Sequence, residues 1–188
     1  MKSLNQAQNN RIVLFSYELA KLDVEVKDMS EVALAMIRYY ANDVKRINHF
    51  LKVHNFAKII GEAENLDEIT QTILEITAYT HDIGIRNSEL KYQSSRGIYQ
   101  QMEGPSEAFK LLNECGIDKD VIDRVCYIIA HHHEYDAVNG LDYQILIEAD
   151  FLVNAFEDEI TLERIQSFKE KVFKTKTGLG LLKSIYGA

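Results

Sequence analysis

The sequence contains few residues that break helices or cross-link a chain. Its 188 residues include one proline, two cysteines and no tryptophan. With a single proline, most segments are free to form helix. Cys115 and Cys126 are too few and too badly spaced for a disulfide scaffold or a thiolate zinc site. These absences favour a helical protein from a reducing compartment.

Basic residues are outnumbered by acidic ones, 21 to 29, and long apolar runs are scarce. The formal net charge is -8, which opposes broad contact with a phosphate backbone and excludes extended nucleic acid as an expected partner. No stretch approaches the roughly 18 uninterrupted apolar residues of a membrane span, and MKSLNQAQNN at the start has no apolar signal core. We therefore expect a soluble, cytoplasmic protein without a membrane partner. The composition leaves its oligomeric state open.

Apolar residues recur at helical spacing along most of the chain. Expected helices are about 32–60 with Gly61 near the stop, from Asn65 or Asp67 to Gly84, from Pro105 to Gly116, from Asp118 to His133, from Asp142 onward, and about 161–173. Residues 86–104 lose this periodicity and predict a long surface loop, with Pro105 in the first turn of the next helix. The fold class expected is all-α, a compact helical bundle of one domain over residues 1–188.

Several polar residues lie on faces that the spacing marks as apolar. Asp150 sits inside ILIEADFLVNAF, where an unpaired carboxylate would cost several kcal/mol, so it needs a positive partner. His49 shares a helical stripe with apolar residues, and so does His132. His81 and Asp82 offer a nitrogen and a carboxylate together at a helix end. Borderline divalent metals accept this mixture of ligands.

Each residue taken alone has a simpler explanation. A single histidine on an apolar face is more often a hydrogen-bonded core residue than a ligand, and Asp150 can instead belong to a buried ion pair. The helix that carries Asp150 has no Lys or Arg beside it to serve as the cation. The set as a whole favours a metal site.

The order of these residues resembles that of the HD-domain metal-dependent phosphohydrolase superfamily: His49, then His81 and Asp82, then a distant Asp150. The segment HFLKVHNFA is similar to the family's H-x-x-(R or K)-V-x-x-x-A, and THDIG looks like its HD core. IIAHHHE and EADFLVN resemble its later segments. The resemblance covers a motif-bearing core of about 45–156, leaving a C-terminal helical extension of about 157–188, and lies closest to small bacterial members of unassigned substrate.

The resemblance implies an HD-type fold that binds one divalent metal ion, of which Mn, Fe, Co, Ni, Mg and Zn are all candidates. Its ligands would be His49, His81, Asp82 and Asp150. Some members hold two ions, using a further histidine in H-G-P where this chain has Glu103, Gly104 and Pro105. Glu103 with His132 is a possible second site, although Glu103 is equally explained as a helix N-terminal charge. The GYP tripeptide of cyclic-dinucleotide phosphodiesterases is missing after HHEYD.

The expected activity is hydrolysis of a phosphate ester, of a nucleotide or a related small phosphorylated metabolite, by metal-activated water. Asp82 would orient the nucleophile, and His132 would either protonate the leaving oxygen or hold the phosphate in place. The residues expected to bind substrate are Lys52, Arg86, Lys91, Arg96 and His131, the second-ranked histidine of its cluster. The three loop cations, Arg86, Lys91 and Arg96, can also be ordinary exposed charges. The three histidines at 131–133 can also be a solvated helix end.

Three alternatives to this hydrolase remain open. The chain can be a phosphodiesterase, or a non-catalytic HD module that senses a nucleotide. A di-iron oxygenase is the third, because related scaffolds host two irons. Turnover of monoesters and diesters, together with the number of metal ions bound, would separate these functions.

Overall fold

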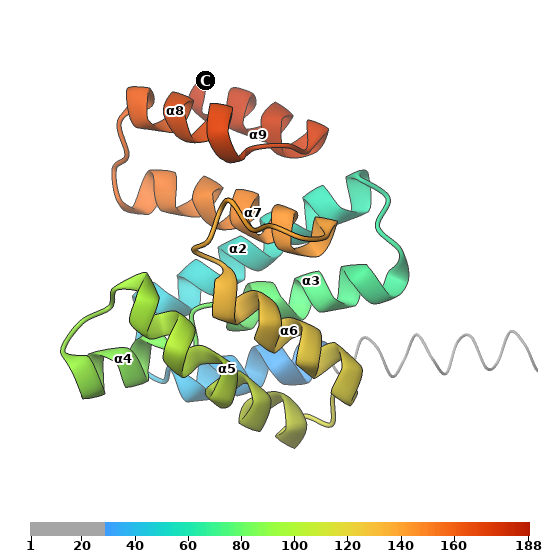
Figure 1. Cartoon of the computed structure of the whole chain (residues 1–188), viewed down its shortest axis with the longest axis vertical. Helices are drawn as coiled ribbons and strands as arrows, with labels where there is room; N and C mark the ends of the chain where they lie inside the picture. Colours follow the sequence, from blue (N-terminus) through green and yellow to red (C-terminus); the bar gives the residue numbers. More distant parts are fainter. Residues whose placement is uncertain (1–28) are drawn as a thin grey trace, which may run out of the picture.

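The computed structural model describes residues 29–188, and every regular element in this part of the chain is a helix (Figure 1). Residues 29–39 are helical, followed by α2 (Val44–Ala63), α3 (Glu68–Thr80), α4 (Ile85–Tyr92), α5 (Gly97–Glu114), α6 (Lys119–His131), α7 (Leu141–Glu157), α8 (Leu162–Val172) and α9 (Lys176–Tyr186). The all-α prediction is confirmed. Residues 1–28 of the predicted single domain lie outside the described residues.

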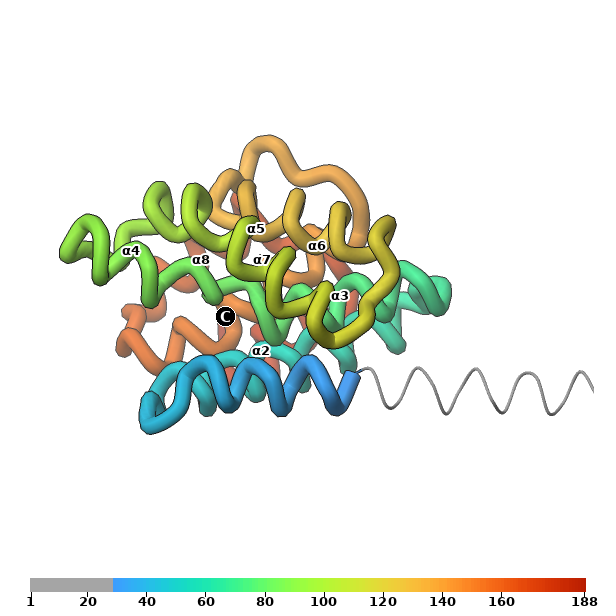
Figure 2. Tube along the Cα trace, turned by 90° about the horizontal axis from the view of Figure 1, so that it is seen from below, coloured from blue at the N-terminus to red at the C-terminus, as the bar shows by residue number. Residues whose placement is uncertain are grey.

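The core lies where α2, α3 and α7 pack against one another. Helices α5 and α6 pack as a pair, with α6 against α3 and α4 against α5. Figure 2 shows the helix of residues 29–39 alongside α2 at one face of the molecule, with α5 and α6 toward the opposite face. Helices α8 and α9 cover α7 on the side away from α5 (Figure 1). The consecutive helices α2 and α3 therefore meet α7, from a distant part of the chain, at one centre.

The apolar periodicity of about 32–60 belongs to two helices and not to one. The chain turns between residues 40 and 43, where Asn42 has a φ of 71° in the left-handed region. Asp43 then caps α2 by accepting a hydrogen bond from the Arg46 amide at 3.1 Å. Two expected caps are present: Asp67 accepts from the Thr70 amide and Asp118 from that of Asp120.

The predicted surface loop of residues 86–104 is wrong. Helix α4 and the first two turns of α5 occupy most of it. The apolar signal failed because the pattern is inverted in α5: Ile98 and Met102 are 56% and 61% exposed, whereas Gln100 and Glu103 are buried. Pro105 accordingly lies inside α5 and not in its first turn.

Helix α5 approaches the turn after α3 very closely. A Cβ atom on Gly84 would lie 2.4 Å from the carbonyl oxygen of Gln100 and 2.7 Å from the amide nitrogen of Gly104. Only glycine allows backbones to pack at this distance. The contact sets α5 beside His81 and Asp82.

The buried carboxylate of Glu148 attaches the C-terminal helices to α7. It accepts hydrogen bonds from the Lys174 amide at 2.7 Å, from the Thr175 amide at 3.0 Å and from the Thr175 hydroxyl. Helix α9, which the apolar pattern did not predict, begins at this point. Its far end is fixed by the Tyr186 hydroxyl, which donates to the Leu152 carbonyl at 2.6 Å.

Across residues 29–188, no helix combines the length and the apolar character that a membrane crossing requires.

Candidate metal centre

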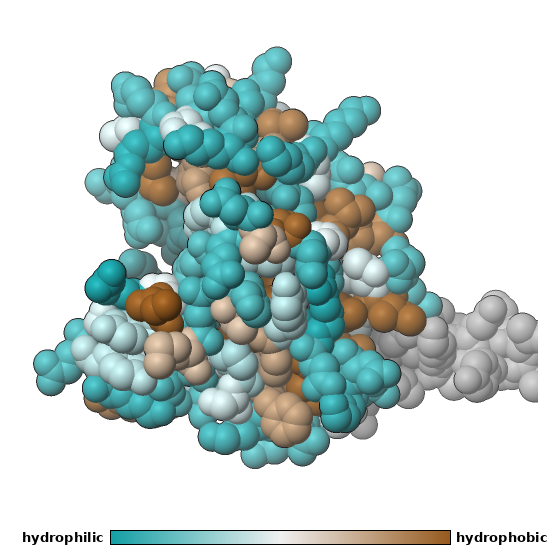
Figure 3. Space-filling model, viewed as in Figure 1, coloured by the Kyte–Doolittle hydropathy of each residue, from teal (hydrophilic) through white to brown (hydrophobic). Residues whose placement is uncertain are grey.

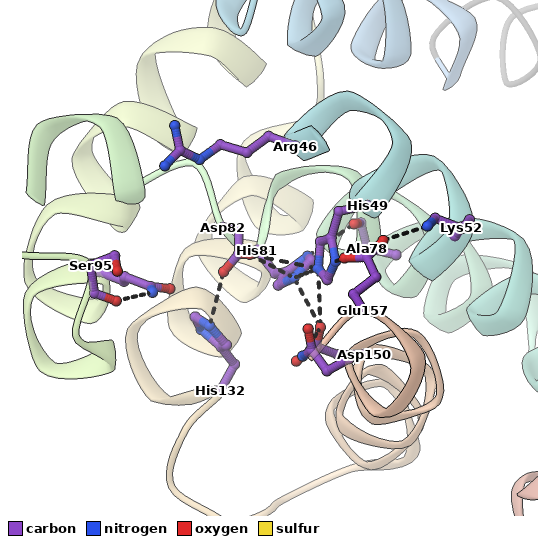
Figure 4. A network of polar contacts seen from close by, with 12 residues as sticks. Arg46, His49, Lys52, Ala78, His81, Asp82, Ser95, His132, Asp150 and Glu157 are labelled. Carbon is purple, nitrogen blue, oxygen red and sulfur yellow. Dashed lines mark hydrogen bonds and ion pairs between the residues drawn. The ribbon is translucent and has the colours of Figure 1, made fainter. Parts of the chain in front are cut away.

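Four polar side chains meet at the centre of the bundle (Figure 4). His49 projects from the middle of α2, and Asp150 projects from α7. His81 is the C-cap of α3, and Asp82 follows it in the turn that α5 abuts. Both histidines are buried. The structure thus brings together the four residues that the sequence singled out as ligands.

The separations from the two imidazole nitrogens are those of ligands that can share one metal ion; His49, His81 and Asp150 form one candidate group of ligands, and Asp82 forms a second with His132 and His133. The Nε2 atoms of His49 and His81 are 3.4 Å apart, and Asp150 Oδ1 lies 3.2 Å and 3.5 Å from them. Asp82 Oδ2 lies 3.6 Å and 3.5 Å from the same two nitrogens. Two ligands that each lie about 2.1 Å from one metal are about 3.0 Å apart at a right angle and about 3.4 Å apart at a tetrahedral angle. The residues present therefore fit a divalent ion.

The outer nitrogen of each ring is bound to an acceptor. His49 Nδ1 lies 2.8 Å from Glu157 Oε2, and His81 Nδ1 lies 3.0 Å from the carbonyl oxygen of Ala78. A carboxylate and a carbonyl only accept, so we assign the proton of both rings to Nδ1 in the neutral form. The Nε2 lone pairs then face the centre, as metal coordination requires.

The same four groups are strongly coupled electrostatically. Burial lowers the pKa of His49, but the hydrogen bond and charge of Asp150, with Asp82, outweigh it and raise this pKa to about 9. The pKa of His81 is raised in the same way, chiefly by Asp82 against its burial. Burial raises the pKa of Asp150, but the two imidazoles hold it below its usual range. The centre therefore attracts positive charge, as a proton or as a metal ion.

His132 adds a buried nitrogen that faces this centre from α6. Its Nδ1 lies 2.8 Å from the Ile129 carbonyl, and its Nε2 lies 3.7 Å from Asp82 Oδ1. That Nε2 atom is buried and has no hydrogen-bond partner in the described part of the chain. Buried polar atoms are normally paired, so this nitrogen calls for a ligand, a water or an ion beside Asp82.

Of the three consecutive histidines, it is His133 and not His131 that joins His132 at the site. The ligand atoms of Asp82, His132 and His133 lie within 4.8 Å of one another. Burial and the charge of His132 lower the pKa of His133 to about 4. The ring of His131 instead packs on Tyr127, whose carbonyl lies 2.7 Å from its Nδ1. The helix stops at this point, so the rings of His132 and His133 lie together at the centre, 3.9 Å apart between centroids, while the ring of His131 faces away from it.

The structure does not bring Glu103 to the metal centre. Its carboxylate lies 2.5 Å from Lys91 Nζ and accepts a hydrogen bond from the Tyr92 hydroxyl at 3.0 Å. The Lys91 ammonium lowers its pKa. Neither candidate group of metal ligands among residues 29–188 includes Glu103. Its pairing with His132 as a second site is therefore not supported, because α5 turns it toward α4.

Three of the four predicted substrate-binding cations contact other groups of the protein. Lys91 pairs with Glu103, and Lys52 contacts Glu157. Arg86 donates to the Tyr39 carbonyl at 2.8 Å and lies over the Tyr39 ring. Arg96 is exposed at the N-cap of α5.

A cavity of about 310 Å³ opens beside Asp82 and His49. In Figure 3 the surface is hollowed at the left, between the region of α4 and α5 and the end of α7. Its apolar lining includes Met36, Phe50, Tyr79 and Ile85, and its polar lining includes Asp43, Ser95, Gln100, Asn154 and Asp158. Among the described residues, its cations are Lys45 and Arg46. A volume of this order accommodates a small metabolite.

Two residues near the ligands were missed in the sequence. Asn154 donates to Asp150 Oδ1 at 2.9 Å, and Glu157 contacts His49. Both lie on the face of α7 that carries Asp150, four and seven residues after it. That spacing is the signal that could have identified them.

Comparison with known proteins agrees with the geometry. The sequence pattern of the HD domain family matches residues 46–164. A solved structure from an uncultured Thermotogales bacterium, described as a predicted HD superfamily hydrolase, has a TM-score of 0.62 with this chain. The two sequences are 23% identical, and the match covers 84% of each chain, which shows a shared fold. No curated protein matches this sequence.

Proposed function

The chain belongs to the HD domain family, and from this membership we propose that it is a metal-dependent phosphohydrolase acting on a nucleotide or a related small phosphorylated metabolite. The observation that carries the proposal is that a carboxylate oxygen of Asp150 and one of Asp82 each lie within 3.6 Å of the same two imidazole Nε2 atoms, beside an open cavity. His49, His81, Asp82 and Asp150 would hold the ion. When bound, a divalent ion lowers the pKa of water and neutralises charge on a phosphoryl oxygen.

Asp82 has one oxygen for each of two tasks. Its Oδ2 faces the two ligand imidazoles, whereas its Oδ1 faces His132. The Oδ1 atom can therefore accept a hydrogen bond from a water molecule and orient it for attack. The hydrogen bond of Tyr40 to the Asp82 carbonyl at 2.8 Å steadies this residue.

We assign the transfer of a proton to the leaving group to His132. Its Nδ1 faces the Ile129 carbonyl, so its Nε2, on the side of Asp82, is the atom that would exchange a proton. In the protonated ring this nitrogen can donate to the ester oxygen as the bond to phosphorus breaks. Neutral His133, beside Gln100 at 3.3 Å, lines the same side of the centre.

The charges around the cavity favour a substrate with a single phosphoryl group. Arg46 is paired with Asp43 at 2.7 Å and with Glu89 at 2.5 Å, so its charge is largely balanced. Lys45 makes no ion pair within residues 29–188 and remains for an anion. A polyphosphate chain would need more cations than this lining offers. The apolar lining suits the organic part of the ester.

A panel of phosphate esters tests the proposal. Nucleoside monophosphates, sugar phosphates and bis(p-nitrophenyl) phosphate would be offered with Mn, Co, Ni, Mg or Fe. We expect metal-dependent hydrolysis of a monoester. Its rate should fall at least about 100-fold in Asp82→Asn, and His132→Gln should show a similar fall that lies in kcat. Asp123→Asn, a change of the same kind at an exposed site, should leave the rate unchanged.

The outcomes separate the alternative functions. Turnover of the diester alone would identify a phosphodiesterase. Saturable binding of a nucleotide without turnover under any metal would identify a sensing module. Two equivalents of iron and consumption of dioxygen would identify an oxygenase, with Asp82, His132 and His133 as the nearest group for a second ion.

A further inference from the structure

One face of α7 carries a ligand and the two residues that support the ligands. Asp150, Asn154 and Glu157 follow one another at spacings of four and three residues, which places them in line along the helix. Asn154 donates to the oxygen of Asp150 that faces His49. Glu157 reaches past Asp150 to the opposite side of the His49 ring (Figure 4).

The carboxylate of Glu157 is held at both oxygens. Its Oε2 lies 2.8 Å from His49 Nδ1, and its Oε1 accepts a hydrogen bond from the Lys52 ammonium. The side chain of Glu157 is 10% exposed, whereas that of Lys52 is 45% exposed. Lys52 follows His49 by three residues on α2, so one turn of α2 and the last turn of α7 form this contact.

The two ligand histidines differ in their outer partners. His81 Nδ1 faces the neutral carbonyl of Ala78, but His49 Nδ1 faces a carboxylate. A carboxylate on the outer N–H of a ligating imidazole fixes its tautomer and makes its inner nitrogen a stronger donor. The Lys52 ammonium limits the negative charge and fixes the rotamer of Glu157.

We propose that Glu157, held by Lys52, is the positioning residue that orients His49 and strengthens its bond to the metal ion. This role rests on the proposed metal centre and adds an outer carboxylate to it. It also assigns Lys52 to the centre and not to the substrate. Glu157 touches neither substrate nor reacting atoms in this role and acts through His49.

The affinity for Co²⁺ of the full chain, measured by calorimetry and by the visible absorption of the bound ion, tests the role without any turnover. We expect Glu157→Ala to weaken Co²⁺ binding about 10- to 100-fold. Glu157→Gln should lose less, because its amide oxygen still accepts from His49 Nδ1. Glu170→Gln makes the same change at an exposed position of α8 and should bind as the unaltered chain does.

Thermal unfolding of the metal-free variants shows whether each one is folded. A metal affinity of Glu157→Ala within about twofold of the unaltered chain would overturn the positioning role and leave the metal centre standing. Failure of the unaltered chain to bind Co²⁺ would overturn the centre and the role together.

Lys52→Met separates the two roles considered for this lysine. If Lys52 holds Glu157, the Co²⁺ absorption spectrum should change while KM for a phosphate ester stays near its original value. A raised KM with an unchanged spectrum would show that Lys52 binds the substrate, and it would overturn the role of Lys52 in holding Glu157.

Discussion

His49 and His81 are 32 residues apart in the chain, yet their Nε2 atoms approach to 3.4 Å inside the bundle. Each nitrogen also faces Asp150, and the outer nitrogen of each ring is bound to an acceptor. Two neutral imidazoles in this arrangement would direct lone pairs at each other. A proton on one of the rings, facing Asp150, or a metal ion bound by both rings would relieve this repulsion.

Addition of a divalent metal ion should stabilise the fold. A ligand that binds only the native state at 100 times its Kd contributes about 2.7 kcal/mol. For a chain of this size that corresponds to a rise in Tm of about 5–10 °C. Differential scanning calorimetry after chelator treatment, with and without Mn²⁺ or Co²⁺, would measure it. Asp82→Asn should show a much smaller rise, and an unchanged Tm in the unaltered chain would argue against the centre.

The metal-free protein should lose stability as the pH rises from about 6.5 to about 9. Burial lowers the pKa of His49, but Asp150 and Asp82 raise it to about 9 from 6.5. In that interval the native state keeps a proton that the unfolded state releases, so the free energy of unfolding falls with increasing pH. Urea unfolding in the presence of a chelator would follow this decline. His49→Gln should flatten the profile, and an equally steep profile in that variant would assign the decline to another group.

Removal of the Glu103 carboxylate should leave metal binding intact. Lys91 and Tyr92 occupy this carboxylate, and it belongs to neither candidate group of metal ligands in the described residues. Glu103→Gln is therefore expected to bind the same number of metal ions per chain as the unaltered protein. Elemental analysis by mass spectrometry would give the count. One ion fewer in the variant would restore Glu103 as a ligand.

Replacement of Glu148 by leucine should destabilise the C-terminal helices. Glu148 is fully buried and accepts from two backbone amides and the Thr175 hydroxyl, which leucine would leave unpaired. We expect a loss of about 3 kcal/mol or more in the free energy of unfolding. Glu148→Gln retains an acceptor and should lose less. Urea unfolding would compare the two, and equal stabilities would show that these hydrogen bonds contribute little.

The fold class could be predicted because its signals are local, whereas the four central residues were predicted as ligands because their order along the chain resembles that of the HD family. Helical spacing of apolar residues is visible in any stretch of the chain, and a carboxylate such as Asp150 is conspicuous among apolar neighbours. His81 and Asp82 are neighbours in the sequence, so they could be recognised as a pair without knowing how the helices pack.

The remaining features depend on how side chains are directed by their neighbours. The start of α5 was missed because Ile98 and Met102 face outward while Gln100 and Glu103 face inward. His133 and His131 differ only in the direction that the end of α6 gives them. The spacing of Glu157 from Asp150 indicates the face of α7 on which it lies, but its partners His49 and Lys52 come from α2, more than 100 residues earlier, and only the packing brings them together.

Helix α7 contacts two parts of the molecule at once. Asp150, Asn154 and Glu157 face the central histidines, while Glu148 faces the start of α9. Each residue of a helix advances it by about 100°, so a single-residue insertion before Glu148 would swing both sets of side chains away from their partners. The rotational register of α7 thus sets both the central metal site and the attachment of α8 and α9. Insertions and deletions in α7 should therefore be far less tolerable than in the turn that follows it.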